Sequence, residues 1–267
     1  MRYIVSVILV LLAAVVSAHD IDGGRRVGMS RAVLLSEPSA SDFVFCPTAY
    51  LSPKRITVES GFLRRYDLSD LDQYYVAAAA EYHRFMFGIG ASQFGKTDYY
   101  AEKILRSTVS YKIDSLAIGV IVSGKMVEFG NMEESFSSIG LGVSAGFNWN
   151  KYHIAVVADN INKPRLAAES EPDYRSVNLY AEIEGSRFYS IVGRLNWQDY
   201  AKVQATLGQI FHLTGNNALM WGIGSNPLTY SGGLELNLDR YYIGYAVTNH
   251  PTLGLSHSIV IGIKNLK

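Results

Sequence analysis

The feature that most constrains the fold is an alternation of apolar residues with small or polar ones, repeated along the chain. The segment 138–149 reads SIGLGVSAGFNW, in which every second residue is apolar and the residues between are Gly, Ser or Asn. A period of two is that of a β-strand, whose successive side chains point to opposite faces. After the polar corner 148–151 the alternation resumes over 152–159. The two stretches are therefore expected to form a β-hairpin with two different faces.

The same pattern occurs fourteen times after residue 54. The predicted strands are 55–62, 74–83, 85–90, 106–113, 115–123, 138–149, 152–159, 176–183, 189–195, 203–208, 219–223, 228–238, 241–247 and 256–264. Between them, short corners at 83–84, 112–115, 148–151, 184–187 and 237–240 alternate with longer polar segments at 64–72, 94–101, 124–135 and 160–175.

This arrangement is typical of bacterial outer-membrane barrels. They have an even number of strands of about 10 residues, with short turns at one end and longer loops at the other. A closed barrel also leaves no open sheet edge in lipid. We therefore predict an all-β fold, a transmembrane antiparallel β-barrel of about fourteen strands over residues 54–267.

A soluble β-sandwich is the alternative, because it also alternates. Its polar face is solvated and is usually rich in Lys and Glu. Here the second face is mostly Gly, Ala, Ser, Thr and Asn with occasional charges of both signs, which suits a crowded lumen. The candidate lumen charges are Arg55, Glu59, Glu81, Arg106, Lys112, Glu182, Arg194 and Glu235. Opposite charges in such an interior are expected to pair across strands.

The beginning of the chain predicts export. An apolar run from Ile4 to Val16 follows Arg2 and ends in the small residues Ser17 and Ala18. We expect residues 1–18 to be a signal peptide, cleaved after Ala18. The run is shorter than the ~18 residues of a spanning helix. The expected location is the bacterial outer membrane, with its lipid as a partner.

Residues 19–53 do not alternate. An exposed tail would leave several apolar side chains in water, namely Val33, Leu34, Leu35, Phe43 and Phe45. We therefore predict that 19–53 is an N-terminal plug segment inside the barrel, with a short helix over 29–35.

Composition and motifs argue against several functional classes. The 24 basic and 24 acidic residues cancel, which argues against a nucleic-acid partner. The single Cys46 has no disulfide partner and is expected to be buried. The histidines lack zinc-site spacing, so neither a metal nor a cofactor is predicted. Ser144, His153 and Asp159 form a conceivable catalytic set. Alternation alone places such residues on one face, however, so the chain is predicted not to be an enzyme.

The two ends of the mature chain carry a resemblance. An Arg, an acidic residue and a Pro precede the first strand, and the final hairpin has Tyr-Ala followed by Leu-Gly-x-Ser-His. The residues that match are Arg31, Asp42, Pro47, Tyr245, Ala246, Leu253, Gly254, Ser256 and His257. The sequence thus resembles the FadL-like outer-membrane barrels, and within them the PorV/PorQ branch associated with type IX secretion in Bacteroidetes-group bacteria.

The sequence also departs from that branch. Leu35 and Ser36 stand where Gly-Gly is expected, Cys46 and Thr48 replace Asn and Ala, and the chain ends at Lys267 without the terminal aromatic residue of outer-membrane proteins.

Two functions follow from the resemblance. The PorV/PorQ branch implies a secretion or assembly component that binds a secreted or surface protein, with ordered loops at 126–134 and 160–175. The alternative is a FadL-like barrel for binding or passage of small hydrophobic solutes, with an apolar path beside the plug.

Overall fold

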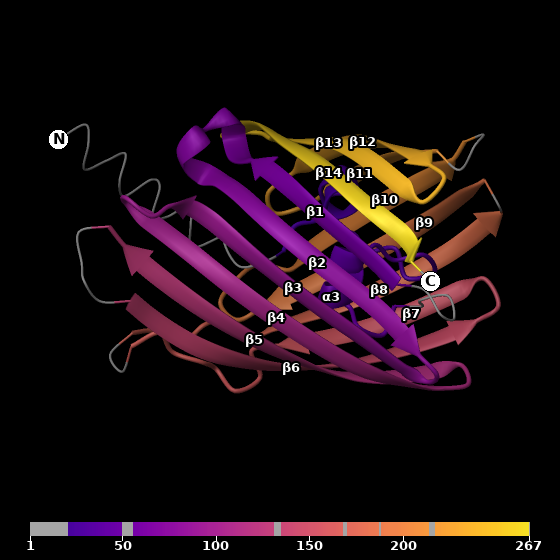
Figure 1. The fold of residues 1–267 in the computed structure, drawn as a ribbon, viewed down its shortest axis with the longest axis horizontal. Helices are drawn as coiled ribbons and strands as arrows, with labels where there is room; N and C mark the ends of the chain where they lie inside the picture. The colour runs from indigo at the N-terminus through magenta and orange to yellow at the C-terminus, as the bar shows by residue number, and fades with distance from the viewer. Residues whose placement is uncertain are drawn as a thin grey trace.

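Fourteen antiparallel strands close into one barrel in the computed structural model (Figure 1). The structure describes residues 21–49, 56–130, 135–167, 170–186, 188–213 and 217–266. The strands are β1 (Ile56–Arg64), β2 (Asp72–Tyr82), β3 (Phe85–Lys96), β4 (Tyr100–Ile113), β5 (Leu116–Phe129), β6 (Ser135–Trp149), β7 (Tyr152–Asp159), β8 (Ser176–Ser186), β9 (Tyr189–Gln198), β10 (Gln204–His212), β11 (Ala218–Gly224), β12 (Thr229–Leu238), β13 (Tyr241–His250) and β14 (Gly254–Leu266). The predicted signal peptide lies outside the described residues.

The barrel closes where the first strand meets the last. β1 pairs with β14 from Ile56 opposite Leu266 to Arg64 opposite His257, and on its other side with β2. Each of the fourteen predicted segments overlaps one observed strand, so the prediction of a fourteen-strand barrel is confirmed. The sandwich alternative is wrong, because every strand has two hydrogen-bonded neighbours in one closed sheet.

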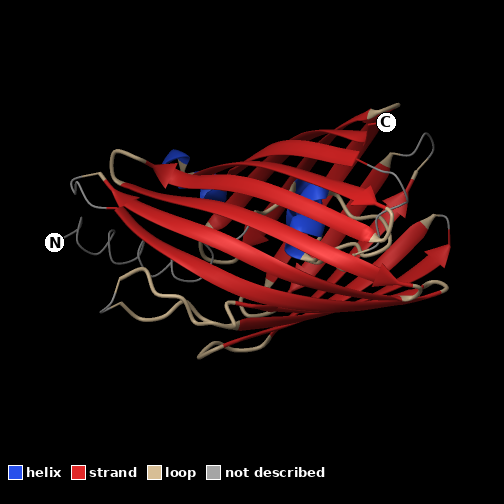
Figure 2. Ribbon diagram, turned by 60° about the horizontal axis from the view of Figure 1, so that its bottom comes forward, coloured by secondary structure: helices blue, strands red, loops and turns tan. Residues whose placement is uncertain are grey.

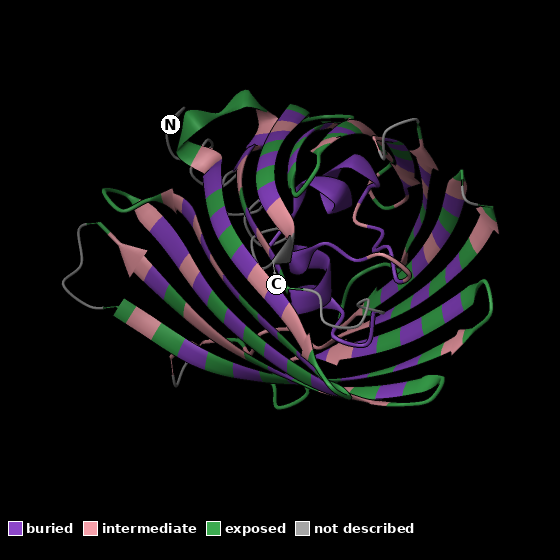
Figure 3. Ribbon diagram, turned by 45° about the vertical axis from the view of Figure 1, so that its right-hand side comes forward, coloured by how far each residue is buried: buried purple, intermediate pink, exposed green. Residues whose placement is uncertain are grey.

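The two faces of the strands divide as the alternation predicts. On β6, Leu141 and Val143 point outward and are 42% and 45% exposed, whereas Gly140, Gly142 and Ser144 between them are buried. Figure 3 shows the same bands of buried and exposed residues crossing the strands around the barrel. Small inward residues leave room in the lumen, and the larger apolar residues form the outer surface.

The connections differ in length at the two ends, which we call the turn side and the loop side. Turn-side connections include the two-residue corners at 83–84, 114–115, 150–151 and 239–240. On the loop side, the connection from β1 to β2 contains the 3-10 turns η1 (Arg65–Asp67) and η2 (Ser69–Leu71), and 160–175 joins β7 to β8.

Two predicted long loops are wrong in extent. Only residues 97–99 separate β3 from β4, and β5 continues to Phe129, so most of 94–101 and 124–135 is strand. The polar residues there continue the ladder: Lys103 on β4 contacts Glu128 on β5, with Nζ 2.7 Å from Oε1. The polar residues predict a loop, but here they belong to strands that extend beyond the ~11 residues that span a membrane.

Residues 21–49, which we call the N-terminal segment, lie inside the barrel (Figure 2). They contain the helices α2 (Gly24–Gly28) and α3 (Ala40–Phe45), and nearly every residue is buried. Cys46 is fully buried and free, and burial raises the pKa of its thiol to about 12. No helix among the described residues is long and apolar enough to cross a membrane. A role as a plug, and its bounds at 19–53, stay predictions.

The helix predicted over 29–35 is wrong. Ser30 and Arg31 have φ of 50° and 72°, which ends α2, and the chain then runs without regular structure. This course sends alternate side chains to different clusters: Leu34 packs with Val192 and Ile210, while Val33 and Leu35 pack with Val157 and Tyr180. The apolar side chains of this stretch are therefore buried on both sides of an irregular chain, and not along one face of a helix.

Candidate functional site: the lumen on the loop side

Three inward carboxylates near the turn side hold the N-terminal segment. Glu235 on β12 is fully buried and lies between Arg25, with Nε 2.7 Å from Oε2, and Lys264, with Nζ 2.7 Å from Oε1. Glu182 on β8 accepts hydrogen bonds from the backbone N–H groups of Leu35 and Ser36. The carboxylates therefore attach the segment to the barrel wall at separate points.

Glu59 on β1 has the same kind of role. It accepts hydrogen bonds from the backbone N–H of Ser41 at 3.1 Å and from the hydroxyl of Tyr242 on β13. Asp42, one residue further on, caps α3 in a reciprocal pair with Ser39. Burial, and then the negative charge of Glu59, raise the pKa of Asp42 to about 6.

The other candidate lumen charges are distributed along the barrel. Arg106 on β4 donates to both carboxylate oxygens of Asp159 at the loop-side end of β7, at 2.9 Å each. Arg194 on β9 is buried and donates from Nε to Asn178 at 2.9 Å. Glu81 and Lys112 interact near the turn side. Arg55 lies outside the described residues.

The pairing expected between candidate charges is found for Glu81 with Lys112 and is replaced by other contacts at several of the remaining positions. Arg106 and Glu235 find partners outside the candidate set, and the carboxylates of Glu59 and Glu182 accept from backbone N–H groups.

The residues that carry the family resemblance lie in several environments. Asp42 and Pro47 belong to the N-terminal segment, and the carbonyl of Pro47 accepts from Ser110. Ala246 is buried against Val27 of α2. Gly254 has φ of +94° at the start of β14, a conformation that favours glycine.

Two of the remaining motif residues face outward. The hydroxyl of Tyr245 and Nδ1 of His257 are 2.7 Å apart, and Tyr245 is 48% exposed on the outer face. Arg31, Leu253 and Ser256, by contrast, line the loop-side lumen. Only part of the motif therefore meets at one site.

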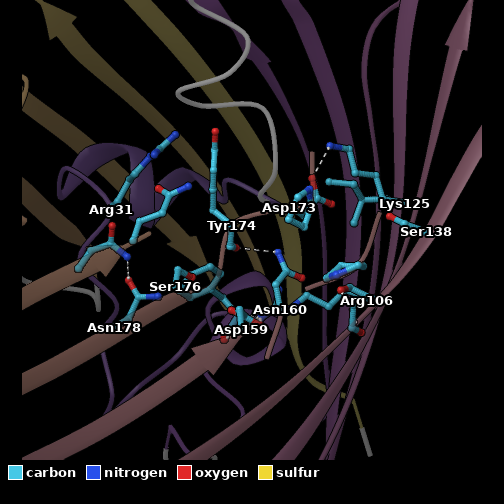
Figure 4. A pocket seen from close by; sticks show the side chains of 18 of the residues that line it. Arg31, Arg106, Lys125, Ser138, Asp159, Asn160, Asp173, Tyr174, Ser176 and Asn178 are labelled. Atoms are coloured by element: carbon cyan, nitrogen blue, oxygen red, sulfur yellow. Dashed lines mark hydrogen bonds and ion pairs between the residues drawn. The ribbon is translucent and has the colours of Figure 1, made fainter. Parts of the chain in front are cut away.

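A polar cavity of about 270 Å³ lies in the loop-side half of the lumen, and we call it the polar pocket (Figure 4). Its walls are the loop-side ends of β7 to β10 and the inner face of β4 to β6. Residues 164 and 171–174 of the loop between β7 and β8 also line it, as do Arg31 and Phe45 of the N-terminal segment. Its lining contains amides, hydroxyls and charges of both signs, among them Asn160, Asp173, Ser176, Asn178, Asn196, Gln198 and Gln204.

A second cavity, of about 350 Å³, adjoins the polar pocket, and we call it the mixed pocket. The two share the lining residues Arg31, Arg194 and Gln204. The mixed pocket adds apolar and aromatic side chains, namely Val27, Leu63, Tyr66, Pro227 and Leu253. The loop-side lumen thus has a polar and a less polar compartment.

Ion pairs order the boundary between the N-terminal segment and these pockets. Asp22 lies 2.7 Å from Arg65 and 3.4 Å from Arg31. Burial alone would raise the pKa of Asp22, but the guanidinium groups of Arg31, Arg26 and Arg65 hold it well below its usual range. Asp22 is therefore ionised throughout the physiological pH range.

The conceivable catalytic set does not assemble. His153 contacts Asn148 and Glu184, with ring nitrogens 2.8 and 2.7 Å from the side-chain oxygens, and Asp159 binds Arg106. His153 and Asp159 are at opposite ends of β7, roughly 20 Å apart at about 3.3 Å per residue. Among the described residues, no group of three or more His, Cys, Asp and Glu could hold a metal.

Several lumen residues were missed from the sequence. Asp22, Arg25 and Arg65 lie outside the alternating strands, and Lys125 belongs to a polar stretch whose sequence predicts a loop. Arg25 and Arg26 are a signal that the sequence contains. Cations in a segment that is expected to be buried need acidic partners, and Arg25 has one in Glu235.

Comparison with protein-family models gives no match, and comparison with curated proteins also gives none. Among solved structures, the barrel is similar to the toluene transporter TbuX of Ralstonia pickettii, with a TM-score of 0.64 and 8% identity, covering 91% of this chain and 97% of that one. It is similar to the P. putida toluene transporter TodX, with a TM-score of 0.61 and 8% identity over 92% and 98% of the two chains.

A Pseudomonas aeruginosa FadL homologue gives a TM-score of 0.55 at 12% identity, covering 91% of this chain and 97% of that one. Identities this low establish the fold alone. The fold of this chain is that of the FadL-like barrels.

Proposed function

We propose that this chain is an outer-membrane barrel that binds a small hydrophobic or amphipathic solute in the loop-side lumen. The observation that carries the proposal is the pair of adjoining pockets above a lumen filled by the N-terminal segment. The outward apolar residues around the barrel suit lipid. Two structures of similar fold, TbuX and TodX, are toluene transporters.

The N-terminal segment supports binding or gated passage rather than free diffusion. Buried apolar clusters join it to strands on several sides of the barrel, through Phe43, Val33 and Leu34 among others. We infer that it acts as a plug, so that a solute in the loop-side pockets goes no further unless part of the segment moves.

Fractionation and a binding titration test the proposal. The protein should fractionate with the outer membrane and migrate faster unheated than boiled, because a closed barrel resists detergent. In proteoliposomes, the fluorescence of N-phenyl-1-naphthylamine should rise saturably, and Leu253→Ala in the mixed pocket should weaken this binding. Leu255→Ala on the outward face of β14 is the matched control. Recovery in the soluble periplasmic fraction, or no saturable binding, would count against the proposal.

A role in secretion or assembly, implied by the PorV/PorQ resemblance, is a second candidate. The observation that favours it is the edge of β6, which pairs with β7 only from Val143 to Trp149. Asn162 and Ile161 bind the next backbone groups of β6, at Leu141 and Ile139. Beyond them, residues 135–138 have no paired strand on that side among the described residues.

Such an edge can accept an extended segment of another protein. A photo-crosslinker at Ser137 should then capture a secreted or surface protein in intact cells, whereas one at Ser186, on the turn side, should not. Recovery of the barrel alone from both positions would remove support for this role.

A further inference from the structure

Most of the charged groups that line the polar pocket have an oppositely charged partner, and Arg194 donates to the amide of Asn178. Arg106 is neutralised by Asp159, and Lys125 lies 3.7 Å from Asp173 and 3.8 Å from Glu102. Arg31 at the pocket boundary lies 3.4 Å from Asp22, a carboxylate that it shares with Arg26 and Arg65. A cavity in which most charges are paired has a smaller net field than one lined by charges of one sign, so its electrostatic attraction to an anion or a cation is reduced.

Between these pairs, the lining is rich in amides and hydroxyls. Each amide presents both donors and an acceptor, and each hydroxyl can do either. Those that line the pocket include Asn160, Ser176, Asn178, Asn196, Gln198 and Gln204. Hydrocarbon placed against them would strip their water without replacing its hydrogen bonds, which is unfavourable.

One side of the mixed pocket is apolar and therefore favours hydrocarbon over polar groups. Val27 and Leu63 are buried in its wall, and Leu253 and Pro227 line it near the loop side. The two pockets meet at Arg194 and Gln204, so an elongated solute that passes these side chains would occupy both at once.

We propose that the polar pocket binds the neutral, hydroxyl-rich head group of an amphipathic solute, such as a sugar, while the mixed pocket holds its apolar part. This inference rests on the proposed function and specifies its substrate class. A volume of about 270 Å³ suits a head group of a few hydroxylated carbons rather than a long chain.

The test compares ligands that share a hexyl chain and differ in head group. Hexyl glucoside, hexanoate, hexylamine and hexane are titrated into the barrel in lipid nanodiscs, with displacement of N-phenyl-1-naphthylamine as the readout. Hexyl glucoside should bind at least about tenfold more tightly than the other three, because only its head group supplies several neutral hydrogen bonds.

Paired variants locate the head group. Gln198→Leu in the polar pocket should reduce the preference for hexyl glucoside by about tenfold and leave hexane unchanged. Gln209→Leu is the matched control, since Gln209 lies on β10 and accepts from Trp221 on the outer face. Leu253→Ala should weaken all hexyl ligands equally.

The outcomes separate this inference from the proposed function. Tighter binding of hexanoate would overturn the neutral head group and assign the site to an anion held by Arg31 and Arg194. Equal binding of all four ligands, or loss of preference in Gln209→Leu but not in Gln198→Leu, would also overturn it while leaving the proposed function in place. If the probe binds and none of the four ligands displaces it, this inference fails and the proposed function stands, whereas absence of saturable binding by the probe itself would remove both.

Discussion

The two halves of the lumen are built from the same alternating strands and yet differ in content. In the turn-side half, the N-terminal segment packs against the wall, and Glu235 and Arg25 are fully or almost fully buried. In the loop-side half, the same inward face lines two cavities of about 270 and 350 Å³. Alternation therefore decides which side chains face inward, while the N-terminal segment decides where the barrel is filled.

The difference predicts unequal consequences for breaking an ion pair. Glu235→Ala in the turn-side half leaves Arg25 and Lys264 buried without their carboxylate, at an expected cost of about 3–5 kcal/mol. Asp173→Ala in the loop-side half removes a longer contact to Lys125, at about 0–1 kcal/mol. The free energy of unfolding, from urea titration in detergent micelles, measures both. Equal losses would mean that the two halves are equally hydrated.

A substituted arginine tests the division between outer face and lumen. Val143→Arg places a charge on the outward face of β6, at about 2–4 kcal/mol if that face meets lipid. Ser138→Arg on the same strand enters the polar pocket, where carboxylates and water are near, and should cost less. The fraction folded into lipid vesicles is the measurement, and the reverse ranking would contradict the assignment of faces, since one residue of slip exchanges them.

Two carboxyl groups of the N-terminal segment predict opposite responses to pH. The pKa of Asp42 is raised from 3.8 to about 6, so its contribution to stability is complete below pH 3.8 and is lost as pH rises through about 6. The pKa of Asp22 is lowered, so its contribution is present above its usual pKa and is lost on acidification below it.

Unfolding midpoints between pH 3 and 8 measure this contrast. Asp42→Asn should remove a decline of roughly 1–3 kcal/mol between about pH 4 and 7. Asp22→Asn should leave that decline in place. A decline that persists unchanged in Asp42→Asn would refute its assignment to this carboxyl.

The smallest effect is expected outside the lumen. Lys103→Ala removes a partly exposed pair with Glu128 on the loop-side extension of β4 and β5, which is worth at most about 1 kcal/mol. The same urea titration should barely register it, and a loss comparable to that of Glu235→Ala would show that the extension is more buried than the structure has it.

The sequence predicts the strands well because a period of two is a local property. It also assigns faces, since Val143 and Ser144 point outward and inward as expected. It fails where the cause lies elsewhere in the fold. Residues 29–35 are not helical, because the barrel wall buries them on both sides and Glu182 binds the backbone N–H groups of Leu35 and Ser36 at their end. The sequence also predicts loops at polar residues that belong to β3, β4 and β5, because these strands extend past the apolar band that alternation identifies.

The candidate site is less accessible to sequence reasoning. Alternation identifies Arg106 and Arg194 as inward, but it gives neither their height in the barrel nor their partners. Asp159 on β7 meets Arg106 on β4 over the inner face of β5 and β6, a contact that depends on the curvature of the sheet. Arg31 reaches the pockets only because a positive φ redirects the chain at that point.

The central claim, that the N-terminal segment closes an otherwise open lumen, is tested most directly by conductance in planar bilayers. The intact protein should show no large steady conductance, and deletion of residues 23–45 should create one in barrels that still migrate faster unheated than boiled. An intact protein that conducts like an open porin would contradict the claim.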